Sequence, residues 1–404
     1  MRRTLFLLAT VPGLLSAQTL GLQDYRLDAG HSIIEFSIPF AFSRIKGRFT
    51  DATGTILYDS SGLAHSSITV VIQTKSLDTG WPHRDEHLRT SDFFDVEKFP
   101  TIVFQSGHLT RNGAGWIADG TLTMHGVTKD VRIPFSLPQP PTRSPESNWM
   151  ILNAVGALKL ARADFGIFGG SAFNSWFSKA RQATMGDSVE IDLEIEAWRA
   201  DAQSLRVPVI VQRLEQVRTQ GIQTQLDRLA EARRTTPDST FGRYLLGSVI
   251  LTRALIGENR VRDAVTLSRT LTELFPTATQ AWMMHGVALA VSGDARGAAR
   301  QYAKAKEVFR PTPRDPNEKF PQVDETWYYL DQTVRLLIEW GRAGQAVPVA
   351  RTISELFPEI ARAQTTYGWT LAASGDATGA AAAYARALAL DANETQALEL
   401  RRRL

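Results

Sequence analysis

Hydrophobic and polar residues alternate along the first half of the chain, from about residue 25 to residue 198. In "SVEIDLEIEAW" (188–198) every second residue from Val189 to Ala197 is apolar, and most of the others are acidic. Similar runs lie at 33–40, 66–73, 101–106 and 130–137. Alternation of this kind predicts half-buried antiparallel strands with one face in water. About eight such strands predict a sandwich or a closed barrel.

The second half has a helical, alanine-rich pattern that repeats at an offset of 82 residues. "AVTLSRTLTELFP" (264–276) recurs as "AVPVARTISELFP" (346–358), and "GVALAVSGDARGAARQYAKA" (286–305) recurs as "GWTLAASGDATGAAAAYARA" (368–387). The spacing of the Gly, Ala and aromatic positions resembles the tetratricopeptide repeat. It predicts an all-α solenoid over residues 208–404, whose concave face is of a kind that commonly binds a peptide or protein partner. The alternative is that the solenoid only packs against the first half.

The N-terminus, "MRRTLFLLATVPGLLSAQ", has the charged, apolar and small-residue order of a secretory signal peptide. We therefore expect a signal peptide over residues 1–17 and a periplasmic or secreted mature protein. The chain has no cysteine, which excludes disulfides, thiolate metal ligands and thiol catalysis. No later run is long and apolar enough to predict a membrane helix. The net charge of +3 does not indicate a nucleic-acid-binding protein.

The stretch "HRDEH" (83–87) matches the His-x-x-Glu-His pattern of zinc peptidases. On a long helix, His83 and His87 could share a metal ion. Pro82 and its neighbours interrupt the chain just before the pattern, and this strand-rich half offers no helix for a third ligand. We therefore favour a polar closure on a short crossover helix, with Leu88, Phe93 and Phe94 plugging one end of a barrel.

The longer stretch "LDTGWPHRDEHLRTSDFFDVEKFPTIVFQS" (77–106) resembles the signature of the YceI-like polyisoprenoid-binding family. The resemblance extends in order over residues 24–199, through "YRLDAGHSIIEFSI" (25–38), "GTLTMHGVTKDVRIPFSL" (120–137) and "ARADFGI" (161–167). It implies an all-β, lipocalin-like, eight-stranded antiparallel barrel that holds a long isoprenoid or similar amphiphile. The tail would lie in the apolar interior and the head group near the mouth. Phe40 stands where the family commonly has His, and the long loop 168–187 is expected to act as a lid.

The inward strand faces and the crossover helix predict which residues contact the ligand. We expect an apolar pocket lined by Phe36, Ile38, Val70, Ile72, Leu88, Phe94, Phe104, Leu122, Phe135, Phe165, Ile191 and Leu193. We expect a polar mouth formed by Arg84, Asp85, Glu86, His87 and Arg89. A one-residue error in register would move a whole set to the other face of its strand.

Two functions follow from the predicted domains: signal peptide (1–17), barrel (24–199), linker (200–207) and repeats (208–404). The first is an exported binding protein for a polyisoprenoid or similar amphiphile, with repeats that bind a protein partner. The second is a non-catalytic adaptor whose barrel is filled by its own side chains. Neither requires a catalytic residue, a metal ion or a cofactor other than the bound lipid.

Overall fold

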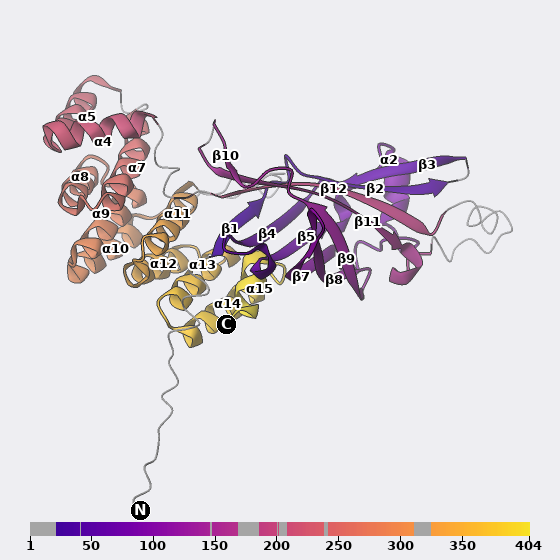
Figure 1. Ribbon diagram of the computed structural model, residues 1–404. Helices are drawn as coiled ribbons and strands as arrows, with labels where there is room; N and C mark the ends of the chain where they lie inside the picture. Colours follow the sequence, from indigo (N-terminus) through magenta and orange to yellow (C-terminus); the bar gives the residue numbers. More distant parts are fainter. Residues whose placement is uncertain are drawn as a thin grey trace, which may run out of the picture. The chain divides into compact units, whose positions relative to one another are not determined.

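The computed structural model divides the chain into two compact units (Figure 1), an all-β unit that ends at Arg199 and an all-α unit that follows it. The structure describes residues 22–40, 42–145, 148–168, 186–199, 201, 208–237, 241–310 and 325–404. The predicted signal peptide, nearly all of the predicted linker and most of the predicted lid loop lie outside these ranges. So does most of the proline-rich stretch 310–322.

The all-β unit is a closed antiparallel barrel, as predicted. The ring runs β11–β9–β8–β7–β5–β4–β1–β12 and closes where β12 pairs with β11. Its strands are β1 (Leu22–Leu27), β4 (Ala52–Asp59), β5 (Ser67–Gln73), β7 (Thr101–Asn112), β8 (Gly115–Met124), β9 (Val127–Ser136), β11 (Met150–Ala161) and β12 (Ser188–Arg199). The short β10 (Thr142–Arg143) pairs with the start of β11.

Three further strands, β2, β3 and β6, lengthen the barrel at one end. β12 pairs with β1 through Trp198 and Ala197, and further along with β2 (Ile33–Phe40). β3 (Ser43–Phe49) pairs with β2, and β6 (Leu77–Asp78) pairs with the end of β3. β2 therefore continues the line of β1 along the same edge of β12. From β2 the sheet goes on to β3 and then β6, in the same way as it goes on from β1 to β4 and then β5. The helix α2 (Pro82–Arg89) follows β6 (Figure 1).

The seam between β9 and β11 is a short connection in the ring. These strands pair through only two residue pairs, Val155 with Ser136 and Gly156 with Phe135. In contrast, β11 pairs with β12 along its whole length. The two-residue turn from β8 to β9 has positive φ at both His125 (51°) and Gly126 (74°), as a type I′ hairpin turn requires. This tight turn reverses the chain, so that β9 pairs with β8 on one side and with β11 at the seam on the other.

The all-α unit consists of antiparallel helices, as the repeat predicts. The described helices are α4 (Pro208–Gln220), α5 (Gln223–Thr235), α7 (Arg243–Gly257), α8 (Val261–Leu274), α9 (Thr279–Ser292), α10 (Ala295–Val308), α11 (Glu325–Glu339), α12 (Ala343–Leu356), α13 (Ala361–Ala373), α14 (Ala377–Leu390) and α15 (Thr395–Arg402). The 82-residue offset superposes α8 on α12, α9 on α13 and α10 on α14. Asp294 and Asp376 cap equivalent helices by accepting from the backbone N–H groups of Gly297 and Gly379 at 2.7 and 2.8 Å.

A buried histidine makes the stability of the all-α unit depend on pH. His285 of α9 lies with its Nδ1 3.1 Å from the Ser268 hydroxyl of α8. Burial, and then the charge of Arg269, lower the pKa of His285 below its ordinary value of 6.5. As the pH falls below 6.5, the His285 imidazole takes up a proton more readily in the unfolded chain than in the folded unit. The contribution of His285 to the free energy of unfolding is therefore fully present above pH 6.5 and is lost as the pH falls below it.

We therefore expect the free energy of unfolding to decrease between about pH 7 and pH 5, with a slope from His285 of at most about 1.4 kcal/mol per pH unit. Urea unfolding at several pH values measures this slope. His285→Gln keeps a polar group near Ser268 but cannot titrate, so its slope should be smaller. An identical slope in both proteins would show that His285 does not contribute.

Candidate functional site

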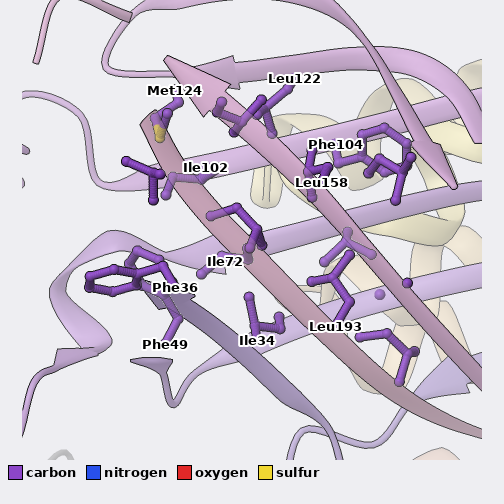
Figure 2. A pocket seen from close by; sticks show the side chains of 18 of the residues that line it. Ile34, Phe36, Phe49, Ile72, Ile102, Phe104, Leu122, Met124, Leu158 and Leu193 are labelled. Atoms are coloured by element: carbon purple, nitrogen blue, oxygen red, sulfur yellow. The ribbon is translucent and has the colours of Figure 1, made fainter. Parts of the chain in front are cut away.

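The barrel encloses a cavity of about 620 Å³. Its lining comes from alternate residues of the strands, as the period-two pattern predicts. On β12, for example, Val189, Ile191 and Leu193 line the cavity, while the acidic residues between them lie on the outer face. Figure 2 shows how side chains from several strands, among them Ile34, Ile72, Phe104, Leu122 and Leu193, converge on the same space. The interior is therefore apolar but is not filled from end to end by its own side chains.

Eleven of the twelve residues predicted to contact the ligand line this cavity. They are Phe36, Ile38, Val70, Ile72, Leu88, Phe94, Phe104, Leu122, Phe135, Ile191 and Leu193. The structure thus brings together residues that are up to 157 positions apart in the sequence, through strand registers such as Val70–Phe104 and Phe104–Leu122. Their contact with a ligand remains a prediction.

Phe165 is the exception. It lies in the short 3-10 helix η3 (Arg162–Phe165) and is fully buried in the barrel wall, in the cluster that includes Leu122 and Val131. Its carbonyl oxygen lies 3.1 Å from Nδ1 of His125, in the β8–β9 turn. The tight turn of η3 ends at Gly166 in the left-handed region, and this directs Phe165 into the wall instead of the cavity. Sequence alternation could not predict this, because η3 interrupts the strand.

The five residues of the predicted polar mouth lie in three different environments. Arg84 and His87 line the cavity, together with Leu88 from the same helix. Glu86 is exposed on α2. Asp85 and Arg89 form hydrogen bonds with the segment that precedes the helix. The five residues therefore do not form one cluster at the mouth.

Asp85 and Arg89 attach α2 to the segment that precedes it. The buried Asp85 carboxylate accepts from the backbone N–H and the hydroxyl of Thr79, at 2.9 and 2.5 Å. Arg89 donates to the carbonyl oxygens of Lys75 and Leu77 at 2.9 and 2.5 Å. Because these bonds satisfy groups that the crossover would otherwise leave unpaired, α2 is held in place with Leu88 directed toward the cavity.

Arginine and histidine side chains give the cavity a polar side. Arg44, Arg84, Arg162, His83 and His87 are among the described residues that line it, and no acidic residue is among them. Arg44 is paired with Glu190 at 2.6 Å. The cavity therefore combines an apolar wall with a polar region that favours an anionic or strongly hydrogen-bond-accepting group.

The two histidines of "HRDEH" make contacts other than those that the zinc-peptidase interpretation requires. His87 Nε2 lies 3.3 Å from Asp92, and the His83 ring lies against Trp81. In the described ranges, the group with metal-ligand spacing is Asp28, His31 and Glu196, on the outer wall. There Asp28, through a 2.9 Å contact, raises the pKa of the exposed His31. Asp28, His31 and Glu196 do not contribute to the lining of the cavity, whereas His83 and His87 do.

Sequence reasoning missed part of the lining, most clearly β11. Leu152, Leu158 and Leu160 of this strand face the cavity, with Ala154 and Gly156 between them. The alternation is present in "LNAVGALKL" (152–160), but the small residues on the inner face weaken the signal. Arg44, Arg162, Trp81 and Phe168 were also missed, because they lie at or near the ends of strands and helices, where alternation does not indicate the direction of a side chain.

The helices α7, α9 and α11 of the repeat unit pack on one another. Arg253 of α7 is buried, lies 5.8 Å from the ring centre of Tyr329 on α11, and has a nitrogen 3.4 Å from the Gln332 side-chain oxygen. Met283 and Val287 of α9, the helix between them in sequence, are also buried. The first helices of these hairpins thus contact one another, and little of α9 is open to a partner.

A closed antiparallel barrel around an apolar cavity, followed by helical repeats, defines a binding module with a repeat domain. Residues 25–197 match the model of the YceI-like domain, and residues 251–316 and 333–395 match that of the tetratricopeptide repeat. A UPF0312 protein of Pseudomonas aeruginosa is 37% identical over 140 residues, which are 34% of this chain and 73% of that protein. The chain belongs to the YceI-like family through its barrel.

Other relatives and solved structures are also similar to part of the chain. A UPF0312 protein of Yersinia pestis is 39% identical over 117 residues, which are 28% of this chain and 61% of that protein. The crystal structure of BcnA from Burkholderia cenocepacia aligns over 42% of this chain and 98% of its own, with 19% identity and a TM-score of 0.37. A polyisoprenoid binding domain from Saccharophagus degradans aligns over 43% and 97%, with 17% identity and a TM-score of 0.31.

Among the described helices, none combines the length and the apolar character that a membrane-spanning helix requires.

Proposed function

We propose that this protein is an exported, non-catalytic carrier that holds a polyisoprenoid or similar long-chain amphiphile in its barrel and binds a protein partner through its repeats. The observation that carries the proposal is the 620 Å³ apolar cavity with basic groups on its polar side. This volume lies within the range of about 300–1,000 Å³ that is usual for small-molecule sites. A barrel filled by its own side chains would have no such space.

The lining favours an amphiphile over a compact polar ligand. Each buried methylene contributes about 0.8 kcal/mol before the cost of association is subtracted, so a long apolar tail can supply most of the affinity. At about 30 Å³ for each water-sized group, the cavity accommodates on the order of twenty such groups. A longer chain has to fold back on itself or project from the barrel. The head group would lie beside Arg84 and Arg162.

The proposals of export and of a protein partner rest on the amino-acid sequence. The order of residues in 1–17 is that of a signal peptide, and an apolar chain needs protection to cross an aqueous compartment. Tetratricopeptide repeats commonly bind peptides or proteins. Because α7, α9 and α11 pack on one another, we place the partner site on exposed helix faces elsewhere in the repeats.

We expect native mass spectrometry of the chain from Gln18 onward, purified without detergent, to show a bound mass that organic extraction removes. The extracted protein should then bind geranylgeraniol, a twenty-carbon isoprenoid alcohol, at one molecule per chain. Hexanol, which has the same polar group without the long tail, is the control and should not be retained. If no mass co-purifies and the extracted protein does not bind geranylgeraniol, the carrier function is wrong and the adaptor remains.

A further inference from the structure

Three aromatic side chains stand in solvent at one end of the barrel. In the part of the chain that the structure describes, the large hydrophobic residues that are exposed include three aromatic ones. Phe42 is completely exposed, and Trp81 and Phe168 are 57% and 59% exposed. We name these three residues the aromatic rim. Exposed apolar groups gathered in one place usually mark a surface that meets another apolar body.

The rim lies next to the cavity. Trp81 and Phe168 line it themselves, and Phe42 lies in the β2–β3 turn between Phe40 and Ser43, which also line it. Trp81 reaches this end because β6 is antiparallel to β3, so the chain after Asp78 heads toward the β2–β3 turn. α2 and this hairpin lie at the same end of the barrel in Figure 1.

The segment that carries Phe168 is attached to the same end. Arg162 donates to the carbonyl oxygen of Gly186 at 3.1 Å and to that of Ile167 at 2.8 Å. The backbone N–H of Gly186 donates in turn to the carbonyl oxygen of Pro39, at the end of β2, at 2.9 Å. Two independent chains of contacts thus bring Trp81 and Phe168 to the β2–β3 turn.

Basic groups accompany the rim. Arg84 lies 5.5 Å from the ring centre of Trp81, and its hydrogen bonds go to the carbonyl and hydroxyl oxygens of Thr79. Arg162 donates only to backbone carbonyl oxygens among the described residues. Both guanidinium groups are therefore bonded to neutral acceptors, and their positive charge is available to an anionic surface.

From this arrangement we propose that the aromatic rim docks the barrel onto a lipid bilayer that contains anionic lipids. Aromatic side chains partition into the interface between lipid tails and water, and basic side chains favour anionic head groups. A tail that leaves the bilayer at the rim enters an apolar cavity without crossing water. The inference rests on the proposed carrier function and adds where the ligand is exchanged.

Vesicle sedimentation with the chain from Gln18 onward tests this, because the apolar N-terminal run is then absent. Vesicles are made of phosphatidylcholine alone or with about a third of phosphatidylglycerol. We expect binding to the mixed vesicles and weaker binding to the neutral ones. Phe42→Ser should lower the partition coefficient on the order of tenfold, and Phe42→Ser with Trp81→Ser on the order of a hundredfold. Serine is a favourable residue at position 81, which is the N-cap of α2.

The matched control removes two exposed apolar residues from other parts of the barrel, Ile33→Ser with Val155→Ser, and should bind vesicles as the unaltered chain does. Equal binding by the rim variant and the control would overturn the proposal. So would a chain that binds neither vesicle, as expected if the rim meets a protein instead. Native mass spectrometry distinguishes a failure of the docking proposal from a failure of the carrier function. A chain that retains its lipid but does not bind vesicles is a carrier without membrane docking. Vesicle binding that depends on the rim, in a chain without any lipid, would sustain the docking surface and refute the carrier.

Discussion

Replacing Phe104 with Asp should remove the ligand from the barrel and lower the barrel's free energy of unfolding by about 3–5 kcal/mol. Phe104 is buried on β7, between Val70 of β5 and Leu122 of β8, and all three side chains line the cavity. A carboxylate at this position would face apolar groups alone, so it loses its hydration without a partner in exchange. Native mass spectrometry measures ligand occupancy, and urea unfolding measures the stability.

Because Phe104→Asp risks unfolding the barrel, a second variant tests the cavity without a charge. Ala118 lies on β8, is buried and lines the cavity. Ala118→Phe places a ring in the space that the ligand would occupy, at a cost in stability that we expect to stay below about 3 kcal/mol. This variant should remain folded and lose most of its bound ligand.

Two control variants accompany these substitutions. Phe104→Leu keeps the wall apolar and should retain the ligand. Ala157→Phe adds the same ring on the exposed face of β11 and should also retain it. A folded Ala118→Phe variant that carries as much ligand as the unaltered chain would show that the ligand is bound elsewhere.

In the repeat unit, Gly286→Ala should lower the free energy of unfolding by about 1–3 kcal/mol. A methyl group at Gly286 of α9 would lie 2.3 Å from a ring carbon of Tyr302 on α10. The Tyr302 ring is buried and fills the space that the glycine leaves, so it cannot simply move away. The same pair recurs 82 residues later, where a methyl at Gly368 would meet Tyr384 at 2.6 Å.

Thermal or urea unfolding of the chain, followed by the helical circular-dichroism signal, measures this loss. Gly344→Ala is the matched control, because a methyl group there meets nothing within 4 Å and alanine favours the α12 helix by up to about 1 kcal/mol. Tyr302→Leu removes the ring atoms in question, so combined with Gly286→Ala it should cost less than the two losses added together. Unchanged stability in Gly286→Ala would contradict the close packing of α9 on α10.

The 82-residue repeat shows how much of the helical fold can be predicted from local sequence in this chain. A Gly, an Ala and a Tyr at fixed spacing predict a helical hairpin because the small residues and the ring must meet wherever two helices pack closely. The structure places Gly286 against Tyr302 as that spacing requires. The same spacing could not predict that the buried Arg253 of α7 contacts Tyr329 of α11, because this contact depends on how successive hairpins turn.

In the barrel, alternation by itself determined which residues of β2, β5, β7 and β12 face inward, because successive side chains of a strand point to opposite faces. Only the tertiary structure decided whether the inward residues fill the interior, since the same Phe-rich set suits a solid core or a hollow one. The outcome depends on the number of strands in the ring and on where α2 packs, since Leu88 of this helix lines the cavity. Phe165 and Asp85 show the same limit: one belongs to the wall and the other to the crossover, because turns and long-range hydrogen bonds determine their positions.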